Sequence, residues 1–240
     1  MAKAFFIDTS RCIACRGCQV ACKEWHGLPA VQTRQRGTHQ NPPDLNPFTY
    51  KLVRFAEGKT GAKVEWLFFP DQCHHCLEPP CRGAADSFVP DAVIVDQKTG
   101  AVLYTEKTGA LTAAQCKEIQ EACPYDIPRR NEQSGLLTKC DMCIDRLRAD
   151  LAPMCVKTCP TGAMNFGERD QMLAMAHQRL EAVKSSHPKA QLVDADNVSV
   201  IYLVTNPGLA LQRPLKQAVE SYSRRELLGN LTAPFRRIAG

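Results

Sequence analysis

The chain has 240 residues, of which 44% are hydrophobic and 23% charged, and its formal net charge is +5. This length suffices for one or two domains, and the composition is that of a folded globular protein rather than of a disordered chain. The best apolar run, residues 198–204, is far shorter than the roughly 20 residues of a membrane-spanning helix, so we expect no membrane anchor.

The N-terminal residues 1–8 contain no apolar stretch of the kind that forms the centre of a signal peptide, and they include an acid, Asp8. We therefore expect a chain without an export signal of its own, although a signal-bearing partner could carry it across a membrane. Within this segment, residues 4–7 are aromatic and β-branched and predict a short strand.

Further elements follow in chain order. Residues 64–69 predict a second strand, and residues 93–95 and 101–104 flank a Gly-containing turn and predict a β-hairpin. Residues 168–184 predict an amphipathic helix, because apolar side chains recur there at helical spacing. These side chains are Leu173, Ala176, Leu180 and Val183.

Two segments carry no periodic pattern. Residues 31–47 are rich in Gln, Asn, Pro and Thr, which is typical of an ordered loop on a partner surface or of a simple connector. From Pro207 onward, basic residues exceed acidic ones, as in a tail that lies along an acidic surface or is solvated. Residues 223–228 resemble a twin-arginine export motif, but no long apolar stretch follows them, so we discount the motif.

The thirteen cysteines are the strongest signal, because they form four groups with the spacing of iron–sulfur ligands. A C-x2-C-x2-C-x3-C-P run holds [4Fe–4S] clusters, and its fourth cysteine ligates the neighbouring cluster. The groups are Cys12, Cys15, Cys18 and Cys22; Cys73, Cys76 and Cys81; Cys116 and Cys123; and Cys140, Cys143, Cys155 and Cys159.

Exchange of the fourth ligand between groups predicts three quartets, each drawn from distant parts of the chain. Quartet A binds cluster A, quartet B binds cluster B, and quartet C binds cluster C. Quartet A is Cys12, Cys15, Cys18 and Cys159; quartet B is Cys22, Cys140, Cys143 and Cys155; and quartet C is Cys73, Cys76, Cys81 and Cys123.

A fourth cluster would use the positions held by Ala85, Ala113, Cys116 and Ile119, of which only one is a cysteine. We therefore expect three [4Fe–4S] clusters, twelve ligands and one orphan thiol, Cys116. Each cluster with its four thiolates adds about −2, which changes the net charge from +5 to about −1. The charge thus gives no support for a nucleic-acid partner.

Several alternatives compete with these clusters. Zinc could use either C-x2-C pair, and disulfides would suit a secreted chain, but the full cysteine run and the Cys-Pro endings favour clusters. Cys116 remains an alternative to Cys123 as a ligand of cluster C. His74 and His75 lie between ligands, and we expect them to shape the loop rather than bind iron. The six histidines form no catalytic set, and no nucleotide-binding fingerprint is present.

The pattern between Cys12 and Gly167 resembles the iron–sulfur subunits of molybdenum and tungsten bis-pterin oxidoreductases, such as formate dehydrogenases, dimethyl sulfoxide reductase and polysulfide reductase. Five stretches look most like the β subunit of soluble periplasmic formate dehydrogenases. They are residues 12–18, 39–45, 66–70, 123–129 and 155–162. The similarity extends to about residue 205.

This resemblance implies a heterodimer in which a large catalytic subunit holds the molybdenum- or tungsten-pterin centre and oxidises formate or reduces carbon dioxide. Electrons would pass singly through clusters A, B and C to a soluble acceptor such as a cytochrome c, and this chain would perform no substrate chemistry. Relatives with a membrane cytochrome usually carry four clusters and an anchor, and this chain departs from them in both respects. The implied location is the periplasm, reached together with a signal-bearing catalytic subunit, or alternatively the cytoplasm.

We therefore predict an α+β fold with two ferredoxin-like, double-cubane domains whose cysteine groups interleave. Residues 1–50 and 130–170 would bind clusters A and B, and residues 51–129 would bind cluster C. Residues 171–240 would form a C-terminal helix, strand and tail that dock on the catalytic subunit. The alternatives are an iron–sulfur subunit of another bis-pterin oxidoreductase, a standalone polyferredoxin carrier, or a structural zinc module.

Overall fold

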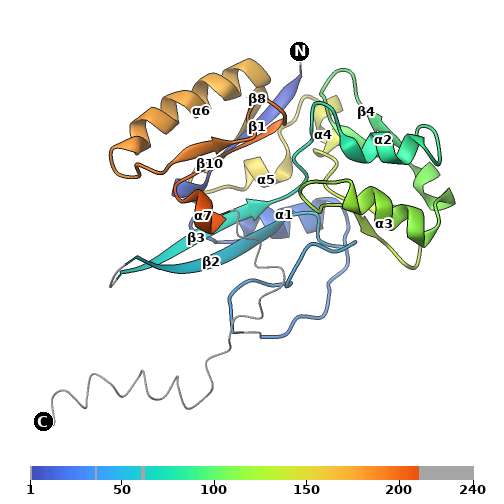
Figure 1. Cartoon of the computed structure of the whole chain (residues 1–240), viewed down its shortest axis with the longest axis horizontal. Helices are drawn as coiled ribbons and strands as arrows, with labels where there is room; N and C mark the ends of the chain where they lie inside the picture. The colour runs from blue at the N-terminus through green and yellow to red at the C-terminus, as the bar shows by residue number, and fades with distance from the viewer. Residues whose placement is uncertain (1, 36, 61–62, 211–240) are drawn as a thin grey trace, which may run out of the picture.

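The computed structural model describes residues 2–35, 37–60 and 63–210, which form a mixed α+β fold (Figure 1). This confirms the predicted class. The strands are β1 (Lys3–Asp8), β2 (Leu52–Thr60), β3 (Lys63–Asp71), β4 (Val93–Val95), β5 (Val102–Tyr104), β6 (Arg129–Arg130), β7 (Leu137–Thr138), β8 (Met164–Glu168), β9 (Gln191–Val193) and β10 (Val200–Val204).

The helices are short, apart from α6. Among the described residues, none is both long and apolar enough to traverse a lipid bilayer. The α-helices are α1 (Gly17–Trp25), α2 (Pro80–Asp86), α3 (Ala113–Glu121), α4 (Ile144–Arg148), α5 (Met154–Lys157), α6 (Arg169–Lys184) and α7 (Pro207–Ala210), and the 3-10 helices are η1 (Thr9–Arg11) and η2 (Glu106–Ala110).

A four-stranded sheet with the order β8-β1-β10-β9 lies at the centre of the fold. β1 runs antiparallel to β8 and parallel to β10, so Phe5 is paired with Phe166 on one side and with Val200 on the other. Every residue of β10 is buried, as are five of the six residues of β1. Strands covered on both faces read as continuous apolar runs, which explains the sequence pattern at residues 4–7 and 198–204.

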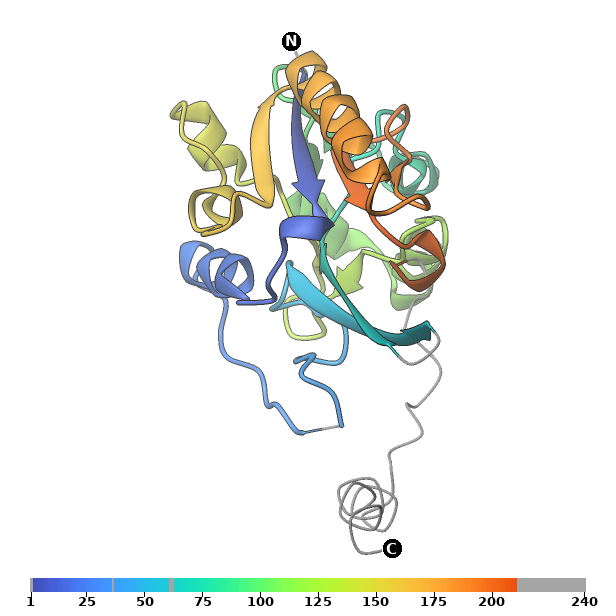
Figure 2. The ribbon, with the colours of Figure 1, turned by 90° about the vertical axis from the view of Figure 1, so that its left-hand side faces the viewer.

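The two faces of this sheet have different neighbours, because successive side chains of a strand point to opposite sides. Phe6 and Ile201 pack against Met172 of α6, which lies along the sheet in Figure 2. Phe5 and Tyr202 face the other way and pack with several of the cysteines. The sheet thus separates the long helix from the cysteine-bearing loops.

The predicted amphipathic helix is confirmed as α6, which begins one residue after Glu168. The predicted C-terminal strand is present as β10 and pairs directly with β1, so the chain up to Val204 is built into the central sheet. Docking of residues 171–240 on a catalytic subunit stays a prediction. The basic tail beyond position 210, with its twin-arginine-like segment, lies outside the described residues.

The remaining strands form three two-stranded ribbons, β2-β3, β4-β5 and β6-β7. The predicted strand at residues 64–69 is confirmed as part of β3, and the predicted hairpin is confirmed as β4-β5. In the turn of this hairpin, Asp96 accepts hydrogen bonds from the backbone N–H and the hydroxyl of Thr99. Gly100 follows with a φ of +77°, a conformation that glycine adopts without strain.

The C-terminal part of the 31–47 segment is tied to the rest of this chain by an ionic network. The two carboxylate oxygens of Asp44 lie 2.6 Å from Arg54 and 2.7 Å from Arg129. Arg54 also contacts Asp71 at 2.7 Å. These pairs are largely buried, so they fix the loop against β2, β3 and the segment after Cys123.

We predict that Met172 is an important contact of α6 with the sheet. Met172 is 5% exposed against Phe6 and Ile201, whereas Met175 on the same helix is 39% exposed. Met172→Ala should lower the free energy of unfolding by about 2–5 kcal/mol through lost burial and a residual cavity. Met175→Ala is the matched control and should change it by less than about 0.5 kcal/mol.

The measurement is the guanidinium midpoint of the anaerobically prepared full chain, followed by circular dichroism. Equal midpoints for the two variants would mean that the packing of α6 on β1 and β10 contributes little to stability.

Candidate metal centres

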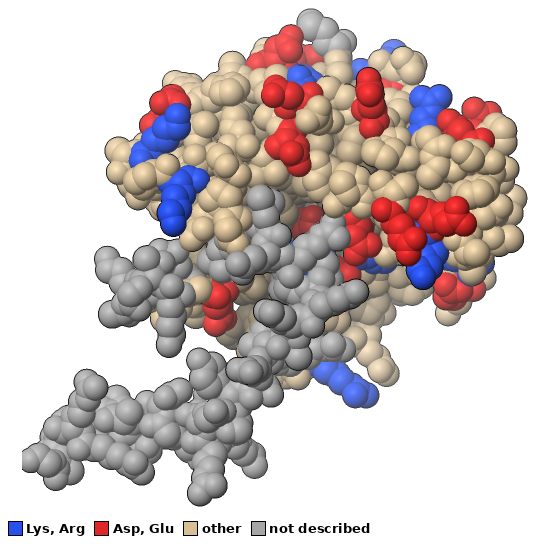
Figure 3. Space-filling model, in the orientation of Figure 1, with Lys and Arg blue, Asp and Glu red and all other residues tan. Residues whose placement is uncertain are grey.

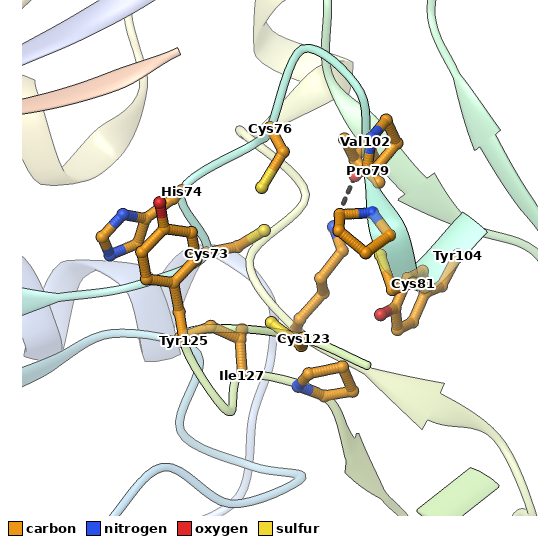
Figure 4. Close-up of a pocket in the computed structure, with 13 residues that line it drawn as sticks. Cys73, His74, Cys76, Pro79, Cys81, Val102, Tyr104, Cys123, Tyr125 and Ile127 are labelled. Carbon is orange, nitrogen blue, oxygen red and sulfur yellow. Dashed lines mark hydrogen bonds between the residues drawn. The ribbon is translucent and has the colours of Figure 1, made fainter. Parts of the chain in front are cut away.

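One cavity in the interior is surrounded by cysteines from two distant segments. Figure 4 shows their four sulfur atoms facing a common space. These are the residues of quartet C, namely Cys73, Cys76, Cys81 and Cys123. Val102 and Ile127 also line the cavity, together with the polar side chain of Lys139. Such a donor set suits a soft metal centre that is shielded from water.

The segments around this cavity fix its shape. His75 is fully buried with a φ of +48°, and its Nδ1 accepts a hydrogen bond from the backbone N–H of Val102 at 3.0 Å. His74 stacks on Tyr125 with ring centroids 3.6 Å apart, as seen at one side of Figure 4. The two histidines thus contribute to the loop and its packing.

A second cavity has the same character. It is lined by the cysteines of quartet A together with Val53, Pro70 and Met164. The four cysteines are Cys12, Cys15, Cys18 and Cys159. Cys15 is exposed, and Ile13 beside it is 61% exposed, so this cavity lies directly below the surface.

The cysteines of quartet B are all buried and are close enough to affect one another's ionisation. Burial raises the pKa of Cys140 well above its usual value, and the charges of Cys22 and Cys143 raise it further. Burial raises the pKa of Cys155 to about 12, with Cys22 among the contributing charges. The structure therefore brings these four residues together from α1, the loop before α4, and α5.

Residues of quartet B are affected by residues of both other quartets. Cys18 of quartet A contributes to the raised pKa of Cys155, for which burial is the main cause. Cys73 of quartet C contributes in the same way to the raised pKa of Cys140. Quartet B thus has neighbours in both other quartets, and the order A, B, C stays a prediction.

The ionisation behaviour of the thiols shows what the quartets can bind. Burial, together with the charges of neighbouring thiols, raises the pKa of Cys18 to about 11 and that of Cys76 to about 12. Thiolates at these positions therefore need a nearby cation, and iron or zinc bound by them supplies one. Burial also acts to raise the pKa of Cys159. Hydrogen bonds from backbone amides, chiefly that of Met164, nevertheless hold this pKa below the usual value. The donor set thus fits a metal–thiolate group.

Residues with left-handed backbone conformations recur in the loops that carry the quartets. The φ angles are +55° at Ala14, +59° at Arg16, +66° at Met142 and +51° at Cys143. Side-chain-bearing residues rarely adopt this region and do so where the surroundings require it. Here it curls each loop around its sulfur atoms.

The third cysteine group folds differently. Residues 113–121 form the regular helix α3, which begins with a capping box between Thr112 and Gln115. Cys116 on this helix is 3% exposed and packs with Ala85 and Ile119 in an apolar cluster. Three of the four positions that a fourth centre would require are therefore filled by mutual apolar packing, and Cys123 rather than Cys116 lines the cavity of quartet C.

Two further residues escape sequence reasoning. Nε2 of His26 lies 2.9 Å from Oδ1 of Asp141, and the same oxygen accepts a hydrogen bond from the backbone N–H of Cys143. Nδ1 of His26 lies 2.9 Å from the carbonyl oxygen of Cys22. Burial opposes a charged imidazole, but Asp141 and Cys22 raise the pKa of His26 to about 11. This Asp141 oxygen already contacts both His26 and the backbone N–H of Cys143. The His26–Asp141 pair therefore links Cys22 on α1 to the loop that carries Cys143, rather than forming a separate metal site.

Sequence reasoning also missed two buried lysines beside the quartets, Lys51 and Lys139. A lysine normally lies at the surface, and nothing in the surrounding sequence marks these two as exceptions. The only available signal for His26 is its position one helical turn after Cys22. None of the thirteen cysteines, all of which are among the described residues, forms a disulfide.

The thiol quartets define a metal–thiolate protein, and comparison with known proteins identifies it as an iron–sulfur protein. A family model described as a 4Fe-4S dicluster domain matches residues 64–169. The chain is 60% identical over 206 residues to the "Formate dehydrogenase 2 subunit beta (cytochrome c-553)" of Nitratidesulfovibrio vulgaris, covering 85% of this chain and 94% of that protein.

It is 53% identical over 210 residues to the formate dehydrogenase subunit beta of Megalodesulfovibrio gigas, covering 87% of this chain and 97% of that protein. It is 36% identical over 182 residues to the nitrate-inducible formate dehydrogenase iron–sulfur subunit of Escherichia coli, covering 76% of this chain but 60% of that longer protein. The chain therefore belongs to the family of β, or iron–sulfur, subunits of formate dehydrogenases, which confirms the predicted resemblance.

The positions of the two cysteines in the third group predict opposite behaviour. Cys123→Ser should cost about one cluster of iron, because its sulfur faces the cavity of quartet C. Cys116→Ser should leave the iron content unchanged, because its side chain packs in the apolar cluster with Ile119. Iron and acid-labile sulfide per chain, measured on anaerobically purified variants, test this. An exchange of the two results would reassign the fourth ligand of quartet C.

Proposed function

We propose that this chain is the electron-transfer subunit of a formate dehydrogenase and that quartets A, B and C each hold one [4Fe–4S] cluster. The observation that carries the proposal is the meeting of four cysteines from distant segments around an enclosed space, seen for quartets A and C. Membership of the formate dehydrogenase β-subunit family supports it. When bound, the clusters would supply one-electron transfer between a catalytic subunit and a soluble acceptor.

The role of this chain is to place and insulate these groups. Apolar side chains such as Met142, Val53 and Ile127 separate the quartets from solvent. Burial of this kind, together with hydrogen bonds to sulfur, sets cluster potentials. No formate chemistry is assigned to this chain, and the oxidation of formate to carbon dioxide, two electrons and a proton belongs to the catalytic subunit.

The same grouping supports the two ferredoxin-like domains of our prediction. Residues 1–50 and 130–170 would form one domain, because Cys22 belongs with Cys140, Cys143 and Cys155, while Cys159 belongs with the first group. Residues 51–129 would form the other, because Cys123 joins the second group. In this second domain one centre is replaced by apolar packing of α2 and α3.

We infer that the catalytic subunit docks at the quartet A end. Large apolar side chains are exposed there: Ile13 is 61%, Val20 57% and Trp25 41% exposed. They lie on the first cysteine loop and on α1, at one side of the central sheet in Figure 2. Exposed apolar side chains gathered next to an electron-carrying site suit a permanent partner better than a carrier that moves freely between enzymes.

The opposite end, at quartet C, would deliver electrons to a soluble acceptor. The name of the Nitratidesulfovibrio vulgaris relative includes cytochrome c-553, and we propose an acceptor of this class in the periplasm. Figure 3 shows acidic side chains gathered near α3, on the same half of the molecule as quartet C. Exposed Glu118 and Glu121 on this helix contribute to a surface that favours encounter with a basic partner.

The decisive test of the proposal is a count of iron and acid-labile sulfide on the anaerobically purified chain. Three quartets should hold twelve irons and twelve sulfides, given four of each per cluster. The reduced protein should give paramagnetic resonance signals of several interacting clusters. Sixteen irons would contradict the loss of the fourth centre, and stoichiometric zinc without sulfide would exclude electron transfer altogether.

A further inference from the structure

Two lysine ammonium groups are enclosed between the quartets. Lys51 is 2% exposed, and its Nζ donates to the carbonyl oxygen of Pro70 at 3.0 Å and to Oε1 of Gln72 at 2.5 Å. Lys139 is 7% exposed, and its Nζ donates to the carbonyl oxygens of Cys140, at 2.9 Å, and Val102. All of these acceptors are neutral.

The nearby carboxylates are already paired with other cations. Burial raises the pKa of Asp71, and Lys51 is among the groups that oppose this rise. The Asp71 carboxylate lies 2.7 Å from Arg54. Burial also acts to raise the pKa of Asp141, and Lys139 is among the groups that lower it. The Asp141 carboxylate lies 2.9 Å from His26. Within the described chain, neither lysine has a carboxylate within ion-pair distance. A buried charge without a counter-ion is costly, so another anion must compensate it.

The cysteine side chains are the remaining groups beside these lysines that become anionic when they bind a metal. Nζ of Lys51 lies 3.0 Å from the carbonyl oxygen of Pro70, and Pro70 lines the quartet A cavity. Lys139 also lines the quartet C cavity, where Figure 4 shows its bond to Val102 as a dashed line.

We propose that Lys51 and Lys139 are resident counter-ions of the electron path, which raise the reduction potentials of the groups held by quartet A and by quartet C, respectively. This inference rests on the proposed function, because it requires clusters in the quartets. A cluster with four thiolates is anionic, and a one-electron reduction adds one further negative charge. A fixed cation nearby stabilises the reduced form more than the oxidised form, most strongly in an interior of low dielectric constant.

The test is a redox titration of the purified complex, followed by paramagnetic resonance under anaerobic conditions. Lys51→Gln keeps a hydrogen-bond donor but removes the charge, and Lys139→Gln does the same at the other end. Each should shift its own midpoint to more negative values, by about 59 mV for a tenfold loss in the one-electron equilibrium constant. The midpoint that moves with Lys51 should stay in place in the Lys139 variant. The Cys123→Ser variant identifies the signal of quartet C.

The matched control is Lys117→Gln, which removes a lysine charge from the exposed face of α3, where Lys117 contacts Glu121 at 3.6 Å. This substitution should leave all midpoints unchanged. Unchanged midpoints in both buried-lysine variants at full iron content would overturn the inference and leave the proposed function intact. Absence of iron from the unmodified complex would instead remove the proposed function itself.

The charged variants Lys51→Arg and Lys139→Arg separate electrostatics from folding. If a Gln variant fails to load its clusters while the Arg variant loads them, the positive charge is required and the inference stands. If the Arg and Gln variants fail alike, the lysine has a packing role and the inference is wrong at that site.

Discussion

The structure depends on one constraint, which is that sulfur atoms far apart in the sequence must meet in the interior. Cys123 reaches the loop of Cys73, and Cys159 reaches the loop of Cys12. Closing such long chain segments costs conformational entropy, and burial raises the pKa of eight of the twelve thiols involved. Neither effect favours the arrangement by itself. In our proposal, metal–thiolate bonds supply the missing free energy, so that cluster binding and folding are a single process.

The central sheet provides the rigid surface against which these sulfur atoms are positioned. Its β10 strand carries Tyr202, which is fully buried, stacks on Phe69 with centroids 4.3 Å apart, and donates a hydrogen bond to the carbonyl oxygen of Pro70. Pro70 in turn lines the quartet A cavity and accepts from Lys51. A displacement of β10 would therefore change the positions of the sulfur atoms, although the strand contributes no ligand. This explains why residues after the last cysteine are built into the core rather than appended to it.

Sequence patterns predicted what is decided locally. The spacing of cysteines within a group is decided locally, because a single loop wraps around a single cluster. The period of apolar residues marks α6, and two strand-like runs around a glycine turn mark the β4-β5 hairpin. The pairing of β10 with β1 and the contact of His26 with Asp141 depend on segments far apart in the chain, so no local pattern marks them. Lys51 was missed for a different reason. Its burial follows from the surrounding fold and contradicts the usual preference of lysine for the surface.

In our proposal, the third cysteine group shows how a fourth centre is lost without leaving a void. Where the quartets have ligand loops with left-handed residues, this group has the capped helix α3, whose buried side chains meet those of α2. Cys116 persists there as a small apolar residue, which is how a buried free thiol behaves. Because Ala85 and Ile119 fill the same cluster, restoring one cysteine would not restore a site. The electron path would then end at quartet C, beside Leu77, whose side chain is 43% exposed. In our proposal, the packing that removes the fourth centre makes quartet C the last one, and exposed Leu77 next to Cys76 marks the side from which a soluble acceptor would approach it.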